Sequence, residues 1–176
     1  MRRILLIGSG GAGKSTLART LAERTELPLI HLDALYWRPG WVETPAAEWR
    51  GIVAGLLQRE AWVMDGNFGS TLDLRLAACD TVIFLDLSPA VCLWRVMKRR
   101  LRYRGESRPD MTQGCPERLD LDFLLWIAFY RLRRRKAILG KLVAAAGNGK
   151  RAIVLNSDAA VAAFVSALPR PASVSG

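Results

Sequence analysis

Histidine and cysteine are scarce in this chain of 176 residues, and long hydrophobic runs are missing from it. Its three cysteines lie 13 and 23 residues apart, without CxxC spacing and without a histidine nearby, which argues against a disulfide scaffold and a zinc site. The longest strongly apolar run, residues 123–130, is far shorter than the roughly 20 residues of a membrane-spanning helix. The apolar run that begins at Ile4 ends after four residues, too early for a secretory signal. We therefore expect a cytoplasmic protein with reduced thiols and no transmembrane segment.

The chain also lacks internal repeats and any Pro-, Gly- and Ser-rich linker, which predicts one domain over residues 1–176. Apolar runs of strand length alternate with segments of helical periodicity. This alternation predicts an α/β fold in three layers, with a parallel sheet covered by helices on both faces. The expected strands are residues 3–7, 28–30, 62–64, 81–85 and 152–155, and the expected helices are residues 14–25, 45–59, 71–77, 89–104, 118–145 and 157–168.

Lysine is the rarer base, with five residues against 21 arginines, and the net charge is +10. Residues 95–151 contain 16 bases and five acids, so this segment carries the whole positive excess. Such a concentration indicates an anionic partner. Residues 105–116 have the composition of a loop and are flanked by arginines. The planar guanidinium group of arginine binds two phosphate oxygens at once. We therefore predict an Arg-rich lid over about residues 95–136.

The most specific motif is GxxxxGK[ST], which runs from Gly8 to Ser15 between an expected strand and an expected helix. Glycines let the backbone wrap around a phosphate with its N–H groups turned inward, and the helix N-terminus adds partial positive charge. We expect Lys14 to contact the β- and γ-phosphates of a bound ATP or GTP and Ser15 to hold Mg²⁺. The residues expected to bind this nucleotide are Ser9, Gly10, Gly11, Ala12, Gly13, Lys14, Ser15 and Thr16.

Three aspartates, Asp33, Asp65 and Asp86, follow expected strands. Ligands of open parallel sheets bind at the carboxyl ends of the strands. Asp33 and Asp65 are candidates for binding an acceptor hydroxyl, and Asp65 also for Mg²⁺, although helix capping or solvent exposure is an equal alternative for both. Asp86 is interpreted as a cap of the next helix. His31 is expected to be packed or hydrogen-bonded rather than to act as a general base.

These motifs together resemble the adenylate-kinase-related proteins known as topology modulation proteins. The resemblance covers about residues 3–140 and depends on the phosphate loop, on the segments at 31–33, 65–67 and 79–86, and on residues 114–117. It implies a P-loop NTPase fold with a five-stranded parallel sheet of nucleotide-kinase type and an Arg-rich lid, with ATP as phosphoryl donor. It also implies that Arg95 lies against the adenine and Arg99 on the phosphates.

The phosphoryl acceptor is left open by the sequence. Adenylate kinases have an arginine three residues after their Asp-Gly motif, where this chain has Gly69, which argues against adenylate. Arg38 and Arg75 are the candidate replacements, and Arg131 is expected on the return side of the lid. The leading hypothesis is a kinase of a small hydroxyl compound or nucleotide, in which Lys14, Arg95 and Arg99 stabilise the transition state and Asp33 serves the acceptor hydroxyl.

Two other hypotheses use the basic segment. One is a nucleic-acid-binding protein with a regulatory ATP site, which would contact phosphates through residues 95–151. The other is docking on a membrane surface through residues 123–136, where apolar residues precede a basic cluster. Among the tryptophans, Trp37 and Trp41 flank a Pro-Gly turn and are candidates to cover a substrate ring, whereas Trp62, Trp94 and Trp126 are interpreted as core residues.

Overall fold

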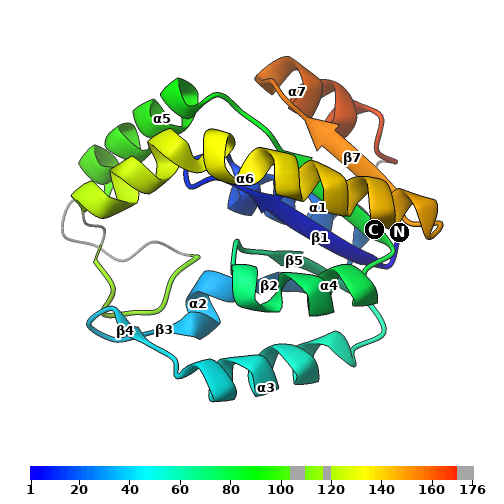
Figure 1. Cartoon of the computed structure of the whole chain (residues 1–176), viewed down its shortest axis with the longest axis horizontal. Helices are drawn as coiled ribbons and strands as arrows, with labels where there is room; N and C mark the ends of the chain where they lie inside the picture. The colour runs from blue at the N-terminus through cyan, green and yellow to red at the C-terminus, as the bar shows by residue number, and fades with distance from the viewer. Residues whose placement is uncertain (104–109, 117–119, 170–176) are drawn as a thin grey trace, which may run out of the picture.

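The computed structural model describes residues 1–103, 110–116 and 120–169 of the chain. Its central sheet has five parallel strands in the order β2-β5-β1-β6-β7 (Figure 1). The predicted α/β fold is confirmed, and each predicted strand lies within one residue of its observed bounds. The strands are β1 (Arg3–Gly8), β2 (Leu29–His31), β5 (Trp62–Asp65), β6 (Thr81–Leu85) and β7 (Arg151–Leu155).

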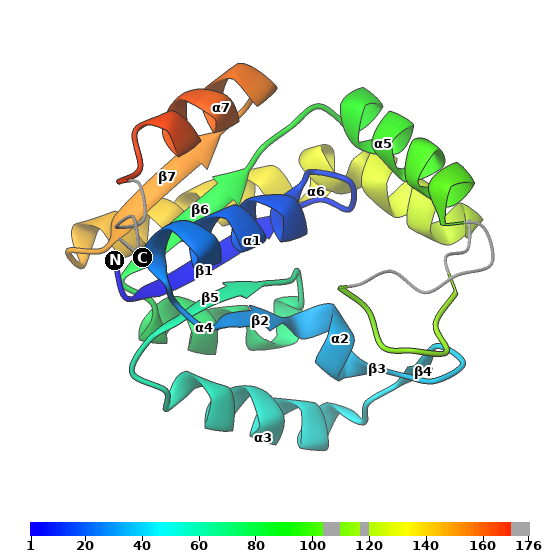
Figure 2. The ribbon, with the colours of Figure 1, turned by 180° about the vertical axis from the view of Figure 1, so that it is seen from behind.

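Helices cover both faces of the sheet, which is why its central strands are apolar at consecutive positions. Leu5 of β1 faces a core formed with α3 (Ala46–Leu57), α4 (Leu72–Ala78) and the C-terminal half of α6 (Leu121–Gly147). Ile4 and Leu6 face the other core. That second core is completed by α1 (Lys14–Thr25), α5 (Pro89–Arg102) and α7 (Asp158–Ser166), as the view from behind shows (Figure 2).

A short helix and a hairpin were not predicted from the sequence. Helix α2 (Leu32–Tyr36) follows β2 directly, and a two-stranded hairpin of β3 (Trp37–Arg38) and β4 (Val42–Glu43) follows it. The turn contains Gly40 and Trp41, both with positive φ (80° and 65°). These elements place Asp33 in the first turn of a helix rather than in a loop after the strand.

The predicted lid is described only in part, because residues 104–109 and 117–119 lie outside the described residues. Residues 110–116 lie against the β3–β4 hairpin. The amide of Gly40 donates to the carbonyl of Gly114 (2.9 Å), and the hydroxyl of Thr112 donates to the carbonyl of Ala34 (2.7 Å). Among the described residues, none of the helices is both long enough and apolar enough to cross a bilayer.

Candidate active site

The phosphate loop joins the end of β1 to the start of α1, and its backbone requires glycine. Gly11 and Gly13 have positive φ values of 74° and 91°. A Cβ atom on Gly11 would lie 2.3 Å from the carbonyl oxygen of Cys92, in the first turn of α5. The loop therefore packs against α5 so closely that only a residue without a side chain fits there.

Lys14 is the first residue of α1 and remains close to the loop that precedes it. Its Nζ atom donates a hydrogen bond to the carbonyl oxygen of Ser9 (2.9 Å). Burial lowers the pKa of Lys14, and the nearby carboxylates of Asp33 and Asp65 oppose this effect. A phosphate bound by the loop would further stabilise the charged form of this lysine.

A cavity of about 460 Å³ lies over the phosphate loop, and we call it the P-loop cavity. The loop contributes Gly10, Gly11, Gly13, Lys14, Ser15 and Thr16 to its lining. Arg95, Arg99 and Arg102 of α5 and Arg19 of α1 also line it. The sequence predicted Arg95 and Arg99 at this place, Arg102 lies within the predicted Arg-rich lid, and Arg19 was missed. Arg95 is held by an ion pair with Asp158, the first residue of α7 (2.5 Å). Four arginines and a lysine thus surround a loop whose amides already favour anions.

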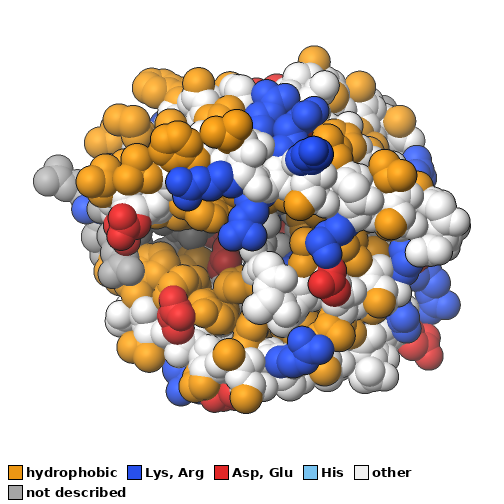
Figure 3. Space-filling model, viewed as in Figure 1, with side chains coloured by type: hydrophobic (Ala, Val, Ile, Leu, Met, Phe, Trp, Pro, Cys, Tyr) orange, Lys and Arg blue, Asp and Glu red, His pale blue; other side chains and the backbone are white. Residues whose placement is uncertain are grey.

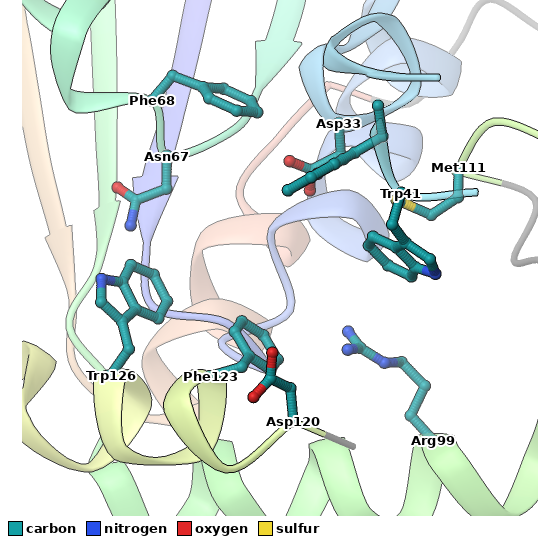
Figure 4. Close-up of a pocket in the computed structure, with 10 residues that line it drawn as sticks. Asp33, Trp41, Asn67, Phe68, Arg99, Met111, Asp120, Phe123 and Trp126 are labelled. Atoms are coloured by element: carbon teal, nitrogen blue, oxygen red, sulfur yellow. The ribbon is translucent and has the colours of Figure 1, made fainter. Parts of the chain in front are cut away.

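A second cavity, of about 350 Å³, has aromatic side chains as half of its lining residues, and we call it the aromatic cavity (Figure 4). It shares part of its lining with the P-loop cavity, so the two adjoin. The shared residues are Asp33, Asn67, Arg99, Phe123 and Trp126. The aromatic cavity alone is lined by Trp37, Trp41, Phe68, Met111 and Asp120.

Two aromatic pairs from distant parts of the chain form opposite parts of this lining. The rings of Phe123 and Trp126 on α6 are nearly parallel, with centroids 5.9 Å apart and an interplanar angle of 13°. The rings of Trp37 and Trp41 on the hairpin meet edge to face at 5.3 Å. Trp41 also donates from Nε1 to the carbonyl of Pro116 (3.1 Å).

The prediction for the hairpin tryptophans agrees with this geometry, because both face a cavity beside the phosphate loop. The interpretation of Trp94 as a core residue was wrong, because it is 65% exposed, whereas Trp62 is buried as interpreted. Trp126 packs on the cores, as interpreted, but it also lines both cavities. The signal that was overlooked is the spacing of Phe123 and Trp126. Aromatic residues three apart share one helix face, and this face begins close to the expected lid.

Asn67 is the neutral polar group of the aromatic cavity, and a buried tyrosine orients it. The hydroxyl of Tyr130 donates to Oδ1 of Asn67 (3.1 Å), which leaves the amide NH₂ group to a ligand. Burial raises the pKa of Tyr130 to about 12, so its hydroxyl stays protonated and able to donate. Asn67 belongs to the segment at residues 65–67, for which the sequence predicted a role only for Asp65. The contact with Tyr130, 63 residues away in the sequence, indicates a role for Asn67 as well.

Asp65 and His31 form a buried pair at the carboxyl edge of the sheet, with His31 Nδ1 2.6 Å from Asp65 Oδ1. Burial alone would lower the pKa of His31, but the hydrogen bond and the charge of Asp65 outweigh it, and the pKa is raised. The interpretation of His31 as a hydrogen-bonded residue is confirmed. Asp65 is only 4% exposed and lines neither of the two cavities, whereas Asp33 lines both.

The chemistry of these residues fits a Mg²⁺ ion bound together with a nucleotide. Mg²⁺ in such sites keeps several waters and takes only one or two protein ligands besides phosphate. Ser15 lines the P-loop cavity together with Asp33, and Asp65 is near enough for its charge to act on Lys14. Within the described ranges, no cluster of three or more His, Cys, Asp or Glu side chains is placed to hold a metal without phosphate.

Three arginines predicted to bind substrate line neither cavity, and each is engaged by protein groups. Arg75 is fully buried, and its guanidinium donates to the carbonyls of Gly66 (3.0 Å) and Phe68. It therefore supports the backbone beside Asn67 rather than reaching a ligand. Arg38 pairs with Glu48 (2.6 Å) on the exposed side of the hairpin.

The third of these arginines, Arg131, pairs with the buried carboxylate of Asp86 (3.2 Å). Arg135 binds the other oxygen of the same carboxylate (2.7 Å). The interpretation of Asp86 as a helix cap was wrong, because Ser88 caps α5 instead, accepting from the amide of Val91 (3.4 Å). These two ion pairs fasten α6 to the end of β6, so part of the basic segment serves the fold.

No protein-family model and no curated protein matches the sequence, but solved structures match the fold. The shikimate kinase from Bacteroides thetaiotaomicron superposes with a TM-score of 0.53 at 19% sequence identity, covering 94% of both chains. The shikimate kinase from Acinetobacter baumannii, solved in complex with shikimate, has a TM-score of 0.56 at 17% identity, covering 94% of this chain and 89% of that one. Identities this low show the fold alone. This chain thus has the P-loop α/β fold found in shikimate kinases, and its resemblance to topology modulation proteins stays a prediction.

Proposed function

We propose that this protein is an ATP-dependent phosphotransferase that moves the γ-phosphoryl group of ATP to a hydroxyl of a small molecule. One observation carries the proposal: the P-loop cavity adjoins the aromatic cavity, and Asp33 and Arg99 belong to the lining of both. A donor phosphate bound by the loop and an acceptor bound between the aromatic rings would thus meet at these two side chains. The likeness in fold to shikimate kinases supports the same reaction class.

Each of these residues has a separate role in the proposed reaction. The loop amides and Lys14 bind the β- and γ-phosphates, and Arg99 balances the charge that spreads over the γ-phosphoryl oxygens during transfer. Asp33 accepts the proton of the acceptor hydroxyl. The hydroxyl oxygen then forms a bond to the γ-phosphorus, while the bond between the γ-phosphorus and the bridging oxygen of the β-phosphate breaks and ADP leaves. Mg²⁺, held by Ser15 and through water by Asp33 or Asp65, would neutralise phosphate charge.

The lining of the aromatic cavity indicates what kind of acceptor it takes. Trp37, Trp41, Phe123 and Trp126 offer apolar ring faces, which bind planar or ring-shaped molecules. Asn67 adds a donor to this lining. We propose that the acceptor is a ring compound with at least one hydroxyl group, such as a nucleoside, a cyclitol or a hydroxylated ring acid like shikimate.

The test measures ADP release from ATP and Mg²⁺ with a panel of these acceptors, for the wild type and for Lys14→Ala. Lys136→Ala is the matched control, because Lys136 is an exposed lysine of α6 that lines neither cavity. We expect one class of acceptor to stimulate ADP release, Lys14→Ala to lower turnover by about a hundredfold or more, and Lys136→Ala to leave it unchanged.

Asp33→Asn separates binding from chemistry. It keeps the shape of the side chain and removes its ability to accept a proton, so turnover should fall while a fluorescent ATP analogue still binds. If no acceptor raises ADP release above the level of Lys14→Ala, the proposed reaction is wrong. If the ATP analogue binds the wild type no better than Lys14→Ala, the proposed nucleotide site is wrong as well.

A further inference from the structure

Helices α5 and α6 pack side by side (Figure 1). Both carry exposed apolar side chains. Figure 3 shows hydrophobic side chains gathered over α5 and the first turns of α6. Among the exposed apolar residues of the two helices, Leu132 is 81% exposed, Leu101 78% and Trp94 65%. We call this set the α5–α6 patch, and its members are Trp94, Met97, Leu101, Leu121, Leu125, Phe129 and Leu132.

The spacing of these residues shows that each helix has a continuous apolar outer side. The members on α5 are three and four residues apart, and those on α6 are four, four and three apart, which places each set along one helix face. The inner sides of the same helices already face the core and the two cavities. Val96 and Ile127 are buried in the core, whereas Arg99 and Trp126 line the cavities. A helix that is apolar on its outer side as well indicates a further partner.

The charges around the patch restrict what this partner is. The two helices carry eleven Lys and Arg residues, and Asp122 is the single acid within their bounds. Four of these bases, Arg95, Arg131, Arg135 and Lys141, pair with acids of other elements, so the positive charge of the outer side comes from the remaining ones. Lys98 and Arg133 are exposed beside members of the patch. A second copy of the chain would bring the same positive charge against itself, which is unfavourable. The phosphates of a nucleic acid would bind the Lys and Arg side chains. A nucleic acid would offer no apolar surface, however, for side chains such as Leu101 and Trp94.

We propose that the α5–α6 patch docks on an anionic phospholipid surface. Apolar side chains such as Trp94 and Leu101 would enter the boundary between headgroups and acyl chains, and the bases beside them would bind headgroup phosphates. Amphipathic helices that bind at such interfaces combine these two features, Trp, Phe and Leu on one side and Lys and Arg beside them. Docking of this kind uses the outer sides of the helices, so it involves residues other than those assigned to phosphoryl transfer.

The test is co-sedimentation of the full chain with vesicles of phosphatidylglycerol and phosphatidylcholine, compared with vesicles of phosphatidylcholine alone. The test variant is Leu101→Glu, and its matched control is Val143→Glu. Val143 is a 74% exposed apolar residue near the C-terminal end of α6, outside the patch. Both variants change the charge by the same amount at an exposed helix position, so circular dichroism and thermal melting should show that both stay folded.

We expect the wild type to bind anionic vesicles, to bind neutral vesicles much more weakly, and to lose anionic binding as salt rises. Leu101→Glu should weaken binding to anionic vesicles about tenfold or more, whereas Val143→Glu should weaken it by about twofold at most. Equal binding to both kinds of vesicle, no binding at all, or equal losses in the two variants would each overturn the proposal. So would a wild-type dimer in light scattering that only Leu101→Glu dissociates, or retention on duplex DNA without retention on vesicles.

Discussion

The contact between the phosphate loop and α5 predicts opposite effects for two glycine-to-alanine substitutions. In Gly11→Ala the new Cβ atom must lie in a backbone with φ of 74°, 2.3 Å from the carbonyl oxygen and 3.0 Å from the carbonyl carbon of Cys92. These are backbone atoms in the first turn of α5, so they cannot rotate away as the end of a side chain could. In Gly140→Ala the new atom points into open space from an exposed position within α6.

The magnitudes follow from these two environments. The left-handed backbone costs a residue with a Cβ about 1–2 kcal/mol, and displacing a packed helix by enough to relieve the contact costs about 1–3 kcal/mol. We therefore expect Gly11→Ala to lose about 3 kcal/mol, which in a chain of this size lowers Tm by about 6–12 °C. Gly140→Ala should gain about 0.5–1 kcal/mol because alanine restricts the unfolded chain and favours the helix, raising Tm by about 1–4 °C.

Thermal unfolding followed by circular dichroism at the helix band measures both effects. If Gly11→Ala melts within about 2 °C of the wild type, the backbone strain and the close contact with Cys92 do not cost the expected free energy, and the prediction is wrong. It is refuted equally if Gly140→Ala is destabilised to the same extent, because the loss would then come from removing any glycine.

Three further predictions concern residues around the cavities. Tyr130→Phe removes the hydroxyl that orients Asn67, so we expect a loss of about 1 kcal/mol in denaturant titration and a higher KM for the acceptor with unchanged affinity for ATP; a change in ATP affinity alone would contradict this role. Asp86→Asn weakens two ion pairs whose arginines are 41% and 43% exposed, so the loss should be about 1–2 kcal/mol rather than the 3–5 of a fully buried pair, and an unchanged Tm would count against the pairing. The pKa of His31 lies above 6.5, since the hydrogen bond and charge of Asp65 outweigh the effect of burial, so the stabilisation from protonated His31 is complete below pH 6.5 and is lost as the pH rises through the folded-state pKa. The difference in unfolding free energy between the wild type and His31→Gln should therefore be larger at about pH 6 than at about pH 8.5, and equal differences would show that the pair does not titrate in this way.

The comparison of sequence and structure shows which features depend on local pattern. The strands and the longer helices were predicted nearly to their ends because hydrophobic periodicity reports burial along a single element. Helix α2 and the β3–β4 hairpin were missed, since five residues and two pairs of residues are too few to show a period. Their shape depends instead on contacts with residues 110–116, such as the hydrogen bond from Trp41 to Pro116.

The wrong predictions for substrate-binding arginines also come from contacts that a local sequence pattern does not show. Arg38 and Arg75 were chosen as replacements for the arginine that is missing at Gly69, and Arg131 was expected on the return side of the lid. Only their partners, Glu48, the carbonyls of Gly66 and Phe68, and Asp86, show why they do not face the cavities. Those partners lie 10, 9, 7 and 45 residues away in the sequence. Spacing along the chain gives no indication of which of several nearby carboxylates or carbonyls an arginine will bind.

The sequence by itself determined the alternation of strands and helices, the position of the phosphate loop, and the arginines of α5 that line the cavity above it. A phosphate loop is a local structure, formed by adjacent glycines and the first turn of the helix that follows them, so a short motif is sufficient to define it. Only the tertiary structure decided that Asn67, Trp41 and Trp126 share one cavity beside that loop. Each comes from a different part of the chain, and the contacts that orient Trp41 and Asn67 join residues more than 60 positions apart, a relation that no periodicity along the chain can express.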